Sequence, residues 1–318
     1  MVSIICNTYN QAKYISDTLN GFVIQETSFP FEVLIHDDAS TDGTVEIIKE
    51  YEKKYPDIIK PIYEKENQYS KGKGLVTKIQ KSRATRKYVA MCEGDDYWTD
   101  PHKLQKQFDF MEANPDYTLC GCSTIWLNML TGKPLGRSQT KFDKDVSLEE
   151  FVMPTNGRPF PYVSFFVRTE IWKEMPKWGF PMGDLPLTYY AALMGKVRML
   201  ADCMCVYRWN SEDSWTLRTA SYEAKAKNSD RMISAYNNLN AYTEGKYSEL
   251  FERAIINSKY AHALYMGDLK TICKDPNLYD YFKKRPFVRR VSDVVRCIMP
   301  KLFMKLQILM GRKKQNND

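Results

Sequence analysis

Three short polar stretches of the sequence carry amide, aromatic or carboxylate side chains that could together bind a charged ligand. They are Asn7-Thr8-Tyr9-Asn10, Asp37-Asp38 and Glu93-Gly94-Asp95-Asp96-Tyr97-Trp98. Carboxylates that converge in one crevice repel one another unless a cation or hydrogen-bond donors compensate their charge. Mg²⁺ and Mn²⁺ prefer oxygen ligands and usually retain waters and phosphates, so one or two Asp side chains suffice when a diphosphate is also bound. The pattern predicts a metal–nucleotide site.

Acidic residues at the ends of strands can also do no more than cap the next helix or solvate a loop. We favour that interpretation for Asp42 and Asp100, which precede predicted helices. Asp95 and Asp96 differ, because two adjacent acids between a buried strand and the bulky Tyr97 would be costly to bury without a partner. We therefore expect this pair to bind a ligand.

Each polar stretch follows a short apolar run that is typical of a β-strand. Strands are predicted over 2–6, 31–36, 60–63 and 87–92, with helices over about 12–25, 44–55 and 75–84. Strands that alternate with helices indicate a largely parallel sheet covered on both faces. Ligands bind such sheets beyond the carboxyl ends of the strands, which is where the polar stretches lie.

The rest of the chain is predicted to complete this domain and to add a helical one. We expect a helix from about 100 to 113, strands over 117–128 and 161–168, a short helix over 184–195 and two short strands within 197–209. Beyond about residue 219 the pattern is helical, over 219–244 and 247–274, and then basic. We therefore place a domain boundary near residue 218, which divides the chain into 1–218 and 219–318.

Five pieces of the sequence, in the same order and at similar spacing, resemble the inverting family 2 glycosyltransferases of the GT-A fold. They lie at 2–10, 33–44, 93–98, 183–187 and 201–209, and the resemblance covers roughly residues 1–218. It implies an α/β fold with a Rossmann-like, mostly parallel central sheet flanked by helices, here with a C-terminal helical extension. It also implies transfer of a sugar from a UDP- or dTDP-sugar to a hydroxyl group, assisted by Mn²⁺ or Mg²⁺.

The resemblance implies a role for each matched residue. Tyr9 would stack on the nucleotide base, Asp37 would accept a hydrogen bond from the base N–H, and Asp184 would act as general base on the acceptor hydroxyl. Asp184 also precedes a predicted helix and could be its N-cap, which is compatible with catalysis. The implied nucleotide-binding residues are Thr8, Tyr9, Asn10, Asp37, Asp38, Asp95 and Arg208, and the implied metal-binding residues are Glu93, Asp95 and Asp96.

Two departures from the family pattern affect these roles. Glu93 stands where the D-x-D element has its first Asp, and its extra methylene changes its reach. Asn210 stands near the position where many relatives carry His after Tyr-Arg, and because Asn brings no positive charge, Arg208 or Lys71 would have to supply it. The Q-x-x-R-W element of processive polysaccharide synthases is absent from the sequence, which favours transfer of a single sugar.

Positive charge is concentrated in one segment of the sequence. The chain carries +7 overall, but residues 283–314 carry +10 and residues 1–282 carry −2. Large apolar residues alternate with the basic ones, an amphipathic mixture interrupted by Pro300. We expect peripheral contact of 283–314 with a membrane surface; packing of this segment on the body of the protein, or on a second copy in a homo-oligomer, is the alternative. Nucleic acid is not an expected partner, since nucleic-acid-binding arms seldom need so many aliphatic residues.

No signal peptide or transmembrane helix is predicted, so we expect a cytoplasmic protein at the inner face of the cell membrane. An acceptor carried on a lipid diphosphate, or another glycan of capsule or envelope polysaccharide synthesis, would be within reach there. The eight cysteines include no C-x-x-C pair and are expected to be buried and reduced.

Three other functions are less well supported by the sequence. A dinucleotide oxidoreductase needs G-x-G-x-x-G after its first strand, whereas the only G-x-G is Gly72-Lys73-Gly74, with Thr77 at the third glycine position. A sugar-activating nucleotidyltransferase needs a glycine-rich basic loop there, which is also absent. A catalytically weak member that acts as a nucleotide-sugar-binding module at a membrane or on a partner is the main alternative, and the intact Asp95, Asp96 and Asp184 argue against it.

Overall fold

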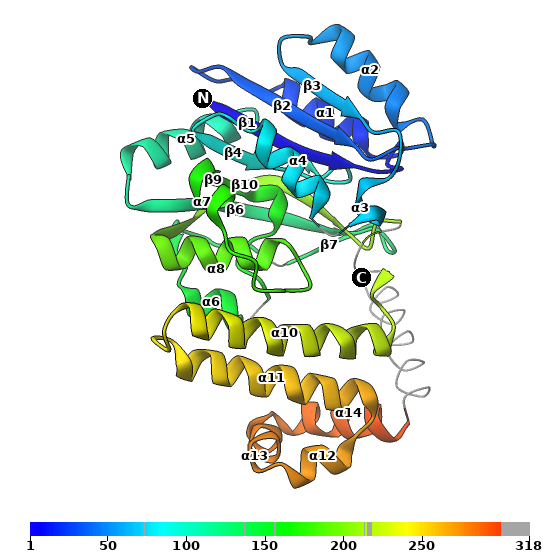
Figure 1. The fold of residues 1–318 in the computed structure, drawn as a ribbon, viewed down its shortest axis with the longest axis vertical. Coiled ribbons are helices and arrows are strands. Elements are labelled where there is room, and N and C mark those ends of the chain that lie inside the picture. Colours follow the sequence, from blue (N-terminus) through cyan, green and yellow to red (C-terminus); the bar gives the residue numbers. More distant parts are fainter. Residues whose placement is uncertain (73, 137, 156, 213, 215–217, 300–318) are drawn as a thin grey trace. The chain divides into compact units, whose positions relative to one another are not determined.

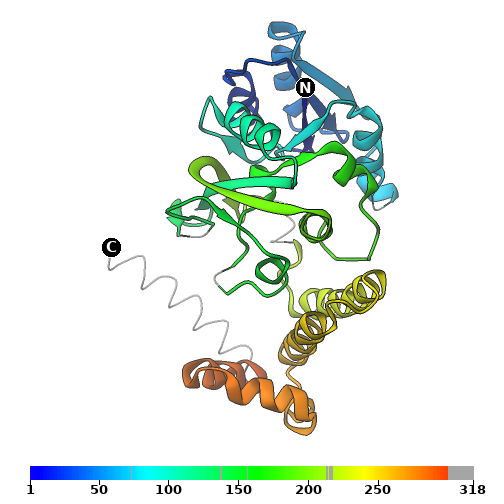
Figure 2. The same ribbon diagram turned by 90° about the vertical axis from the view of Figure 1, so that its left-hand side faces the viewer.

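The structure is a computed structural model that describes residues 1–72, 74–136, 138–155, 157–212, 214 and 218–299 (Figure 1 and Figure 2). The chain divides into two compact units. The first unit comprises Met1–Pro176 and Gly183–Ser214, and the second comprises Lys177–Met182 and Trp215–Asp318. Residues 177–182, which precede the boundary expected near residue 218, therefore group with the C-terminal helices.

The N-terminal half of the first unit is a parallel sheet with helices between its strands. Strand β1 (Val2–Thr8) pairs in parallel with β2 (Phe31–Asp37) and β4 (Tyr88–Met91), and β2 pairs in parallel with β3 (Ile59–Tyr63). The intervening helices are α1 (Ile15–Val23), α2 (Thr44–Lys54), α3 (Gln68–Lys71) and α4 (Leu75–Arg83). This half confirms the alternation of strands and helices predicted from the sequence, with the short helix α3 as an addition.

The other half of the sheet is mixed. Its strands are β5 (Tyr97–Trp98), β6 (Tyr117–Asn128), β7 (Lys133–Leu135), β8 (Lys144–Asp145), β9 (Phe166–Arg168) and β10 (Lys196–Trp209). The main sheet order is β3-β2-β1-β4-β9-β6-β10-β5, and β9 is antiparallel to both of its neighbours. The prediction of two short strands within 197–209 is wrong, because β10 is one 14-residue strand that absorbs register shifts against β6 instead of breaking.

Shorter helices complete the first unit. They are α5 (Lys103–Ala113), α6 (Leu148–Val152), the 3₁₀ turn η1 (Tyr162–Ser164), α7 (Thr169–Glu174) and α8 (Asp184–Met194). Asp42 Oδ1 accepts a hydrogen bond from the backbone N of Thr44 at 3.1 Å, and Asp100 Oδ1 accepts one from His102 at 2.8 Å. These two acids thus bind backbone N–H groups beside the starts of α2 and α5, but the N-caps themselves are Gly43 and His102, not the predicted acids.

The core of the first unit contains most of the cysteines, all of them with free thiols. Those that are buried are Cys6, Cys92, Cys120, Cys122 and Cys205. The expectation of burial is wrong for Cys203 and Cys273, which are exposed, and for Cys297, which is partly exposed. Cys203 lies between two register shifts of β10, which take it out of the alternation that would place it beside Cys205.

The second unit is helical. Its described helices are α10 (Tyr222–Tyr242), α11 (Ser248–Met266), α12 (Leu269–Lys274), α13 (Pro276–Lys284) and α14 (Phe287–Ile298). Segment 177–182 packs on α10, where the rings of Trp178 and Tyr242 are in contact. The single helix expected over 247–274 is divided at Gly267, whose φ of 69° ends α11 in a left-handed conformation. None of the helices in the described ranges is both long and apolar enough to cross a membrane.

Gly21 allows α1 to approach β5 closely. A Cβ at this position would lie 2.8 Å from the backbone O and 2.9 Å from the backbone N of Trp98. We therefore expect Gly21→Ala to lower the free energy of unfolding by about 1–3 kcal/mol, measured by urea denaturation. Gly136→Ala is the matched control, because a Cβ there meets nothing within 4 Å and stability should stay unchanged or rise slightly. Equal losses for the two variants would contradict this role of Gly21.

Candidate active site

The ends of β1 and β2 carry one exposed aromatic ring on a fixed turn. Tyr9 follows β1 and is 46% exposed. The backbone N of Asn10 donates to Ser40 Oγ at 2.9 Å, and Asn10 Oδ1 accepts from the backbone N of Thr41 at 2.8 Å. Asn10 has a φ of 52°, a left-handed conformation that Asn adopts more readily than most residues. The turn thus leaves the Tyr9 ring accessible while its backbone is tied to the loop after β2.

The adjacent carboxylates Asp37 and Asp38 are both buried but are used differently. Asp38 is fully engaged, because its two oxygens accept from the backbone N of Gln68 at 2.6 Å and of Tyr69 at 3.0 Å. Asp37 Oδ1 accepts from the backbone N of Ser40 at 3.0 Å, but its Oδ2 has no hydrogen-bond partner among the described residues. A buried carboxylate oxygen without a partner is costly, so Asp37 Oδ2 keeps a hydrogen-bonding capacity that the described residues do not use.

Two more buried oxygens near the end of β1 have no hydrogen-bond partner within the described parts of the chain. They are Thr8 Oγ1 and Gln11 Oε1. Both lie against Gly94, since a Cβ at that position would be 2.8 Å from Thr8 Oγ1 and 2.4 Å from Gln11 Oε1. Any other side chain at position 94 would therefore fill the space beside them. Together with Asp37 Oδ2, these atoms give the first unit a small set of unused hydrogen-bonding groups.

Asp95 and Asp96 lie in the loop between β4 and β5, and each is held by a hydrogen bond. Asp96 is 1% exposed, and its Oδ1 accepts from the backbone N of Arg208 at 2.7 Å. Asp95 Oδ2 accepts from Ser211 Oγ at 2.7 Å. Burial raises the pKa of Asp96 well above its ordinary value and the charge of Asp95 raises it further, while burial also raises the pKa of Asp95. A cation that reached both carboxylates would relieve this repulsion.

Arg208 orders the acidic loop. Its guanidinium donates to the backbone O of Asp95 at 2.9 Å and pairs with Asp17. The nucleotide-binding role expected for Arg208 stays a prediction; the contacts that it makes in the free protein are with this loop and with α1. Lys71, the other cation considered from the sequence, pairs with Glu66 at the surface.

Asp184 pairs with Arg158 instead of capping α8. It is the first residue of the helix, whose N-cap is Gly183 without a side-chain hydrogen bond, so the capping role considered from the sequence is not observed. The side chains of Asp184 and Arg158 are 19% and 30% exposed. Because a guanidinium forms directional hydrogen bonds, the pair fixes the orientation of the carboxylate.

Four of the carboxylates singled out in the sequence lie within electrostatic range of Tyr207 on β10. The pKa of the Tyr207 phenol is raised first by burial and then by the negative charges of Asp96, Glu93, Asp95 and Asp184. Glu93 itself is exposed. The first unit therefore brings together, around one side chain of β10, acidic groups that are up to 91 positions apart in the sequence.

The described residues do not form a complete metal cage by themselves. Within the described ranges, no group of three or more His, Cys, Asp or Glu side chains is placed to hold an ion. What the loop after β4 does supply is an all-oxygen and incomplete donor set, the buried Asp96 and the partly exposed Asp95 with the exposed Glu93 nearby. Mg²⁺ and Mn²⁺ commonly take their other ligands from phosphate and water. These residues therefore fit such an ion only when a phosphate-bearing ligand is also bound.

Sequence reasoning missed four residues that act on this site. Thr18 Oγ1 lies 2.6 Å from the backbone O of Asp96, and Ser211 and Arg158 bind the carboxylates described above. The pKa of Tyr162 on η1 is raised by burial and then by Glu93 and Asp184. Of these four, only Thr18 could have been noticed in the sequence, because it is a polar residue on the apolar face of a predicted helix. The other three lie outside the five matched pieces.

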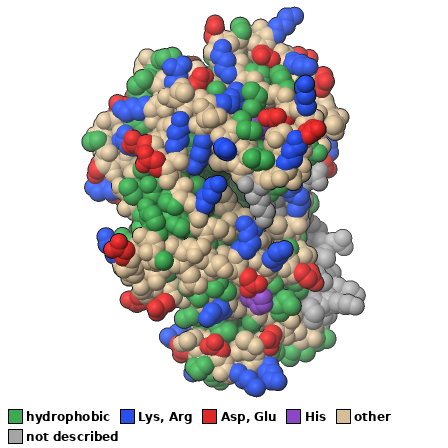
Figure 3. Space-filling model, viewed as in Figure 1, with side chains coloured by type: hydrophobic (Ala, Val, Ile, Leu, Met, Phe, Trp, Pro, Cys, Tyr) green, Lys and Arg blue, Asp and Glu red, His purple; other side chains and the backbone are tan. Residues whose placement is uncertain are grey.

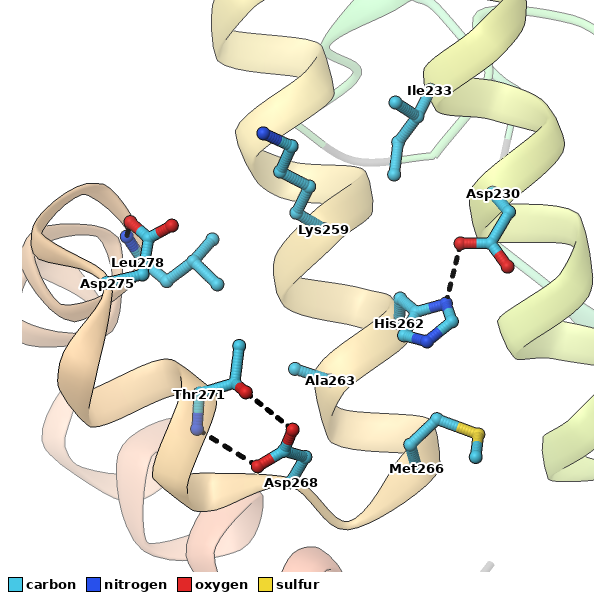
Figure 4. Close-up of a pocket in the computed structure, with 10 residues that line it drawn as sticks. All are labelled: Asp230, Ile233, Lys259, His262, Ala263, Met266, Asp268, Thr271, Asp275 and Leu278. Atoms are coloured by element: carbon cyan, nitrogen blue, oxygen red, sulfur yellow. Dashed lines mark hydrogen bonds and ion pairs between the residues drawn. The ribbon is translucent and has the colours of Figure 1, made fainter.

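A separate groove in the second unit contains none of the predicted residues (Figure 4). His262 Nδ1 on α11 pairs with Asp230 on α10 at 2.8 Å, and Asp268 and Asp275 are engaged as N-caps of α12 and α13. These groups are thus occupied in holding the helices together. We assign no function to this groove.

Comparison with known proteins gives a family match. Residues 3–168 match the family described as Glycosyl transferase family 2. An uncharacterized protein of Mycobacterium tuberculosis (strain ATCC 25618 / H37Rv) is 34% identical over 221 residues, which are 67% of this chain and 60% of that protein. Glycosyltransferase TuaG of Bacillus subtilis (strain 168), named for teichuronic acid biosynthesis, is 38% identical over 126 residues, 39% of this chain and 48% of TuaG. The chain thus spans less than two thirds of the length of these relatives.

Two solved structures resemble most of this chain in fold. TarS 1–349 of S. aureus in complex with UDP-GlcNAc has a TM-score of 0.55 and 19% identity, and the match covers 95% of this chain and 85% of that one. Mannosyltransferase PcManGT of Pyrobaculum calidifontis, in complex with GDP-Man and Mn²⁺, has a TM-score of 0.57 and 15% identity, with 98% and 84% covered. These likenesses confirm the GT-A fold with additional C-terminal helices.

The different use of Asp37 and Asp38 predicts different effects on stability. Asp38→Asn places an amide NH₂ against a backbone N–H of Gln68 or Tyr69 and should lower the free energy of unfolding by about 1–3 kcal/mol. Asp37→Asn can keep the hydrogen bond from the backbone N of Ser40, because its NH₂ can take the place of Oδ2, which accepts no hydrogen bond from the described residues. Its loss of unfolding free energy should therefore be at least about 1 kcal/mol smaller than that of Asp38→Asn. Urea denaturation of both variants is the measurement. A larger loss for Asp37→Asn would mean that Oδ2 is engaged in the free protein.

Proposed function

The chain belongs to glycosyl transferase family 2, and from that premise we propose that it moves a single sugar from a UDP- or dTDP-sugar to a hydroxyl group, with inversion at the anomeric carbon. The observation that carries the proposal is the adjacent pair Asp95 and Asp96, which Ser211 Oγ and the backbone N of Arg208 hold in the loop after β4. Sugar transfer needs one group at the departing diphosphate and another at the attacking hydroxyl. The acidic loop and Asp184 are the candidates for these two tasks.

The base of the donor is proposed to lie on the exposed ring of Tyr9. Stacking on an aromatic ring suits any base, so the choice of base depends on hydrogen bonds. Asp37 Oδ2 would accept the imide N–H of uracil or thymine, and this would satisfy the buried oxygen that has no partner among the described residues. Thr8 and Asn10 flank the ring, and Asp38 anchors the loop after β3 through Gln68 and Tyr69.

Asp95 and Asp96 are proposed to hold Mn²⁺ or Mg²⁺ against the donor diphosphate, with Glu93 in support. A divalent ion there would neutralise negative charge on the departing diphosphate. The protein's own part is to keep the two carboxylates in place, which Ser211 does for Asp95 and the backbone of Arg208 does for Asp96. PcManGT, which shares the fold, is in complex with Mn²⁺ as well as GDP-Man, and this is a reason to test Mn²⁺ first.

Asp184 is proposed to take the proton from the acceptor hydroxyl as its oxygen attacks the anomeric carbon in line with the departing diphosphate. The Arg158 guanidinium binds Asp184 Oδ2, which orients the carboxylate and directs Oδ1 to the acceptor. Arg158 is therefore a positioning residue, and Asp184 is the general base. A positioned base contributes about 10²–10⁴-fold to a rate.

The acceptor is proposed to be a glycan or a lipid-linked glycan of capsule or envelope polysaccharide synthesis, reached from the cytoplasm at the inner face of the membrane. TuaG is named for teichuronic acid biosynthesis, and TarS is named as a poly(ribitol-phosphate) N-acetylglucosaminyltransferase. The basic and apolar composition of residues 283–314 supports a peripheral contact with a membrane.

Asp184→Asn separates chemistry from binding. The substitution keeps the size of the side chain but removes the base, so UDP affinity should persist while the rate of sugar transfer falls about 10²-fold or more. The measurements are calorimetric titration with UDP and single-turnover transfer from the UDP-sugar that gives turnover with the wild type.

The matched control for this experiment is Asp275→Asn, which changes an acid that caps α13 by accepting from the backbone N of Asn277 and Leu278. Because Asn caps helices about as well as Asp, its transfer rate should equal that of the wild type. Near-wild-type transfer by Asp184→Asn would assign the base to another residue. UDP binding without transfer in the wild type would favour the binding-module alternative.

A further inference from the structure

Helix α14 is attached to the second unit through its polar side. Asp293 is 3% exposed, its Oδ2 accepts from Tyr260 Oη at 2.8 Å, and it forms an ion pair with Arg285 at 2.8 Å. One turn later, Cys297 Sγ lies 3.9 Å from the backbone O of Leu264. Polar contacts of Asp293 therefore help to hold this helix to α11 and to the turn after α13, together with packing of Cys297 on the apolar cluster around Leu264.

The opposite side of α14 is apolar and faces outward. Four of its residues are largely exposed: Phe287 71%, Val288 78%, Val291 47% and Ile298 64%. Val294 and Val295 line a shallow apolar groove beside them, together with Phe282 of α13. The positions follow one helical face, at i, i+1, i+4, i+7, i+8 and i+11. We call this face, residues Phe287, Val288, Val291, Val294, Val295 and Ile298, the α14 apolar face.

A helix that turns its polar side toward the protein and its apolar side toward solvent is unusual. Amphipathic helices of soluble domains normally bury the apolar stripe, and a contiguous exposed apolar patch marks a surface that binds a partner. The partner has to be apolar where it meets this face. It also has to tolerate positive charge, because residues 283–299 carry six Lys or Arg and one Asp, and that Asp is paired with Arg285.

Figure 3 shows basic, acidic and hydrophobic side chains next to one another over the last described helices. Exposed Lys283 and Lys284 end α13, Arg289 is exposed on α14, and Arg290 lines the same groove as Val291. Long basic side chains at the border of an apolar face can extend their charged heads toward anionic lipid headgroups while their stems stay in apolar surroundings.

We propose that the α14 apolar face is a docking surface for an anionic lipid bilayer, with the helix lying in the plane of the interface. This inference deepens the membrane contact of the proposed function by naming the residues that enter the bilayer. The apolar face supplies the buried area, and the surrounding basic residues supply the preference for anionic lipid.

Two other occupants of this face fit the charge less well. A second copy of the chain would bring an equally basic surface to the same contact, and like charges placed opposite each other oppose association. Residues 300–318 lie outside the described part of the chain, and their sequence carries five Lys or Arg against one Asp. Either occupant would increase the positive charge beside α14, whereas anionic lipid would compensate it.

The test is sedimentation of the full-length protein with vesicles, without any sugar donor. One set of vesicles is phosphatidylcholine alone, and the other is an equal mixture of phosphatidylcholine and phosphatidylglycerol. The variant Val288→Asp/Val291→Asp adds two charges to the apolar face at exposed positions, so the fold should be retained, which thermal unfolding checks. Phe142→Asp in the first unit is the matched control, since Phe142 is 79% exposed.

We expect the wild type and Phe142→Asp to bind the anionic vesicles, more weakly as salt is raised, and the double variant to bind at least tenfold more weakly. Equal binding by the double variant, or no binding by the wild type, would overturn the proposal. Self-association that the double variant loses, without vesicle binding, would assign the face to a second copy instead. Because no donor is present, failure here leaves the proposed transferase activity untouched.

Discussion

The first unit depends on holding two adjacent carboxylates after a central strand, the buried Asp96 and the partly exposed Asp95. Asp95 and Asp96 cannot be taken out of water without compensation, and the chain supplies it from distant segments. The backbone N of Arg208, near the end of β10, donates to Asp96, and the hydroxyl of Ser211, just after β10, donates to Asp95. Thr18 of α1 donates to the backbone O of Asp96 in the same loop. This requirement ties α1, the loop after β4 and β10 to one another. It also leaves a concentration of negative charge that a bound cation would neutralise.

The features of the fold that could be predicted are those set by local pattern. The strands β1, β2 and β4 are short apolar runs that end in polar residues, and these patterns are visible without any tertiary contact. The sequence could not predict which hydrogen bonds two identical neighbouring residues form. Asp37 and Asp38 are equivalent in the sequence. Asp38 accepts from backbone amides 30 and 31 positions away, whereas Asp37 keeps one oxygen that has no partner among the described residues. The Arg158–Asp184 pair and the continuous course of β10 likewise depend on contacts between distant segments.

The two units use polar and apolar groups in opposite ways. In the first unit, polar groups that lie beyond the strand ends are buried and bind one another, which prepares a site before any ligand arrives. In the second unit, buried polar contacts at Asp293 attach a helix whose apolar face is left outside. The sequence predicted an amphipathic segment within 283–314, but the side on which α14 is held became apparent only from the contacts of Asp293 and Cys297.

The central claim is that the acidic loop after β4 binds a nucleoside diphosphate together with a divalent cation. Calorimetric titration of the wild-type protein with UDP, once in Mn²⁺ and once in EDTA, tests it most directly. Because the two carboxylates cannot approach a diphosphate without an intervening cation, we expect affinity in Mn²⁺ to exceed that in EDTA by at least tenfold, about 1.4 kcal/mol. Equal affinity in the two buffers, or no binding of UDP in either, would contradict the assignment of this loop as a metal–nucleotide site.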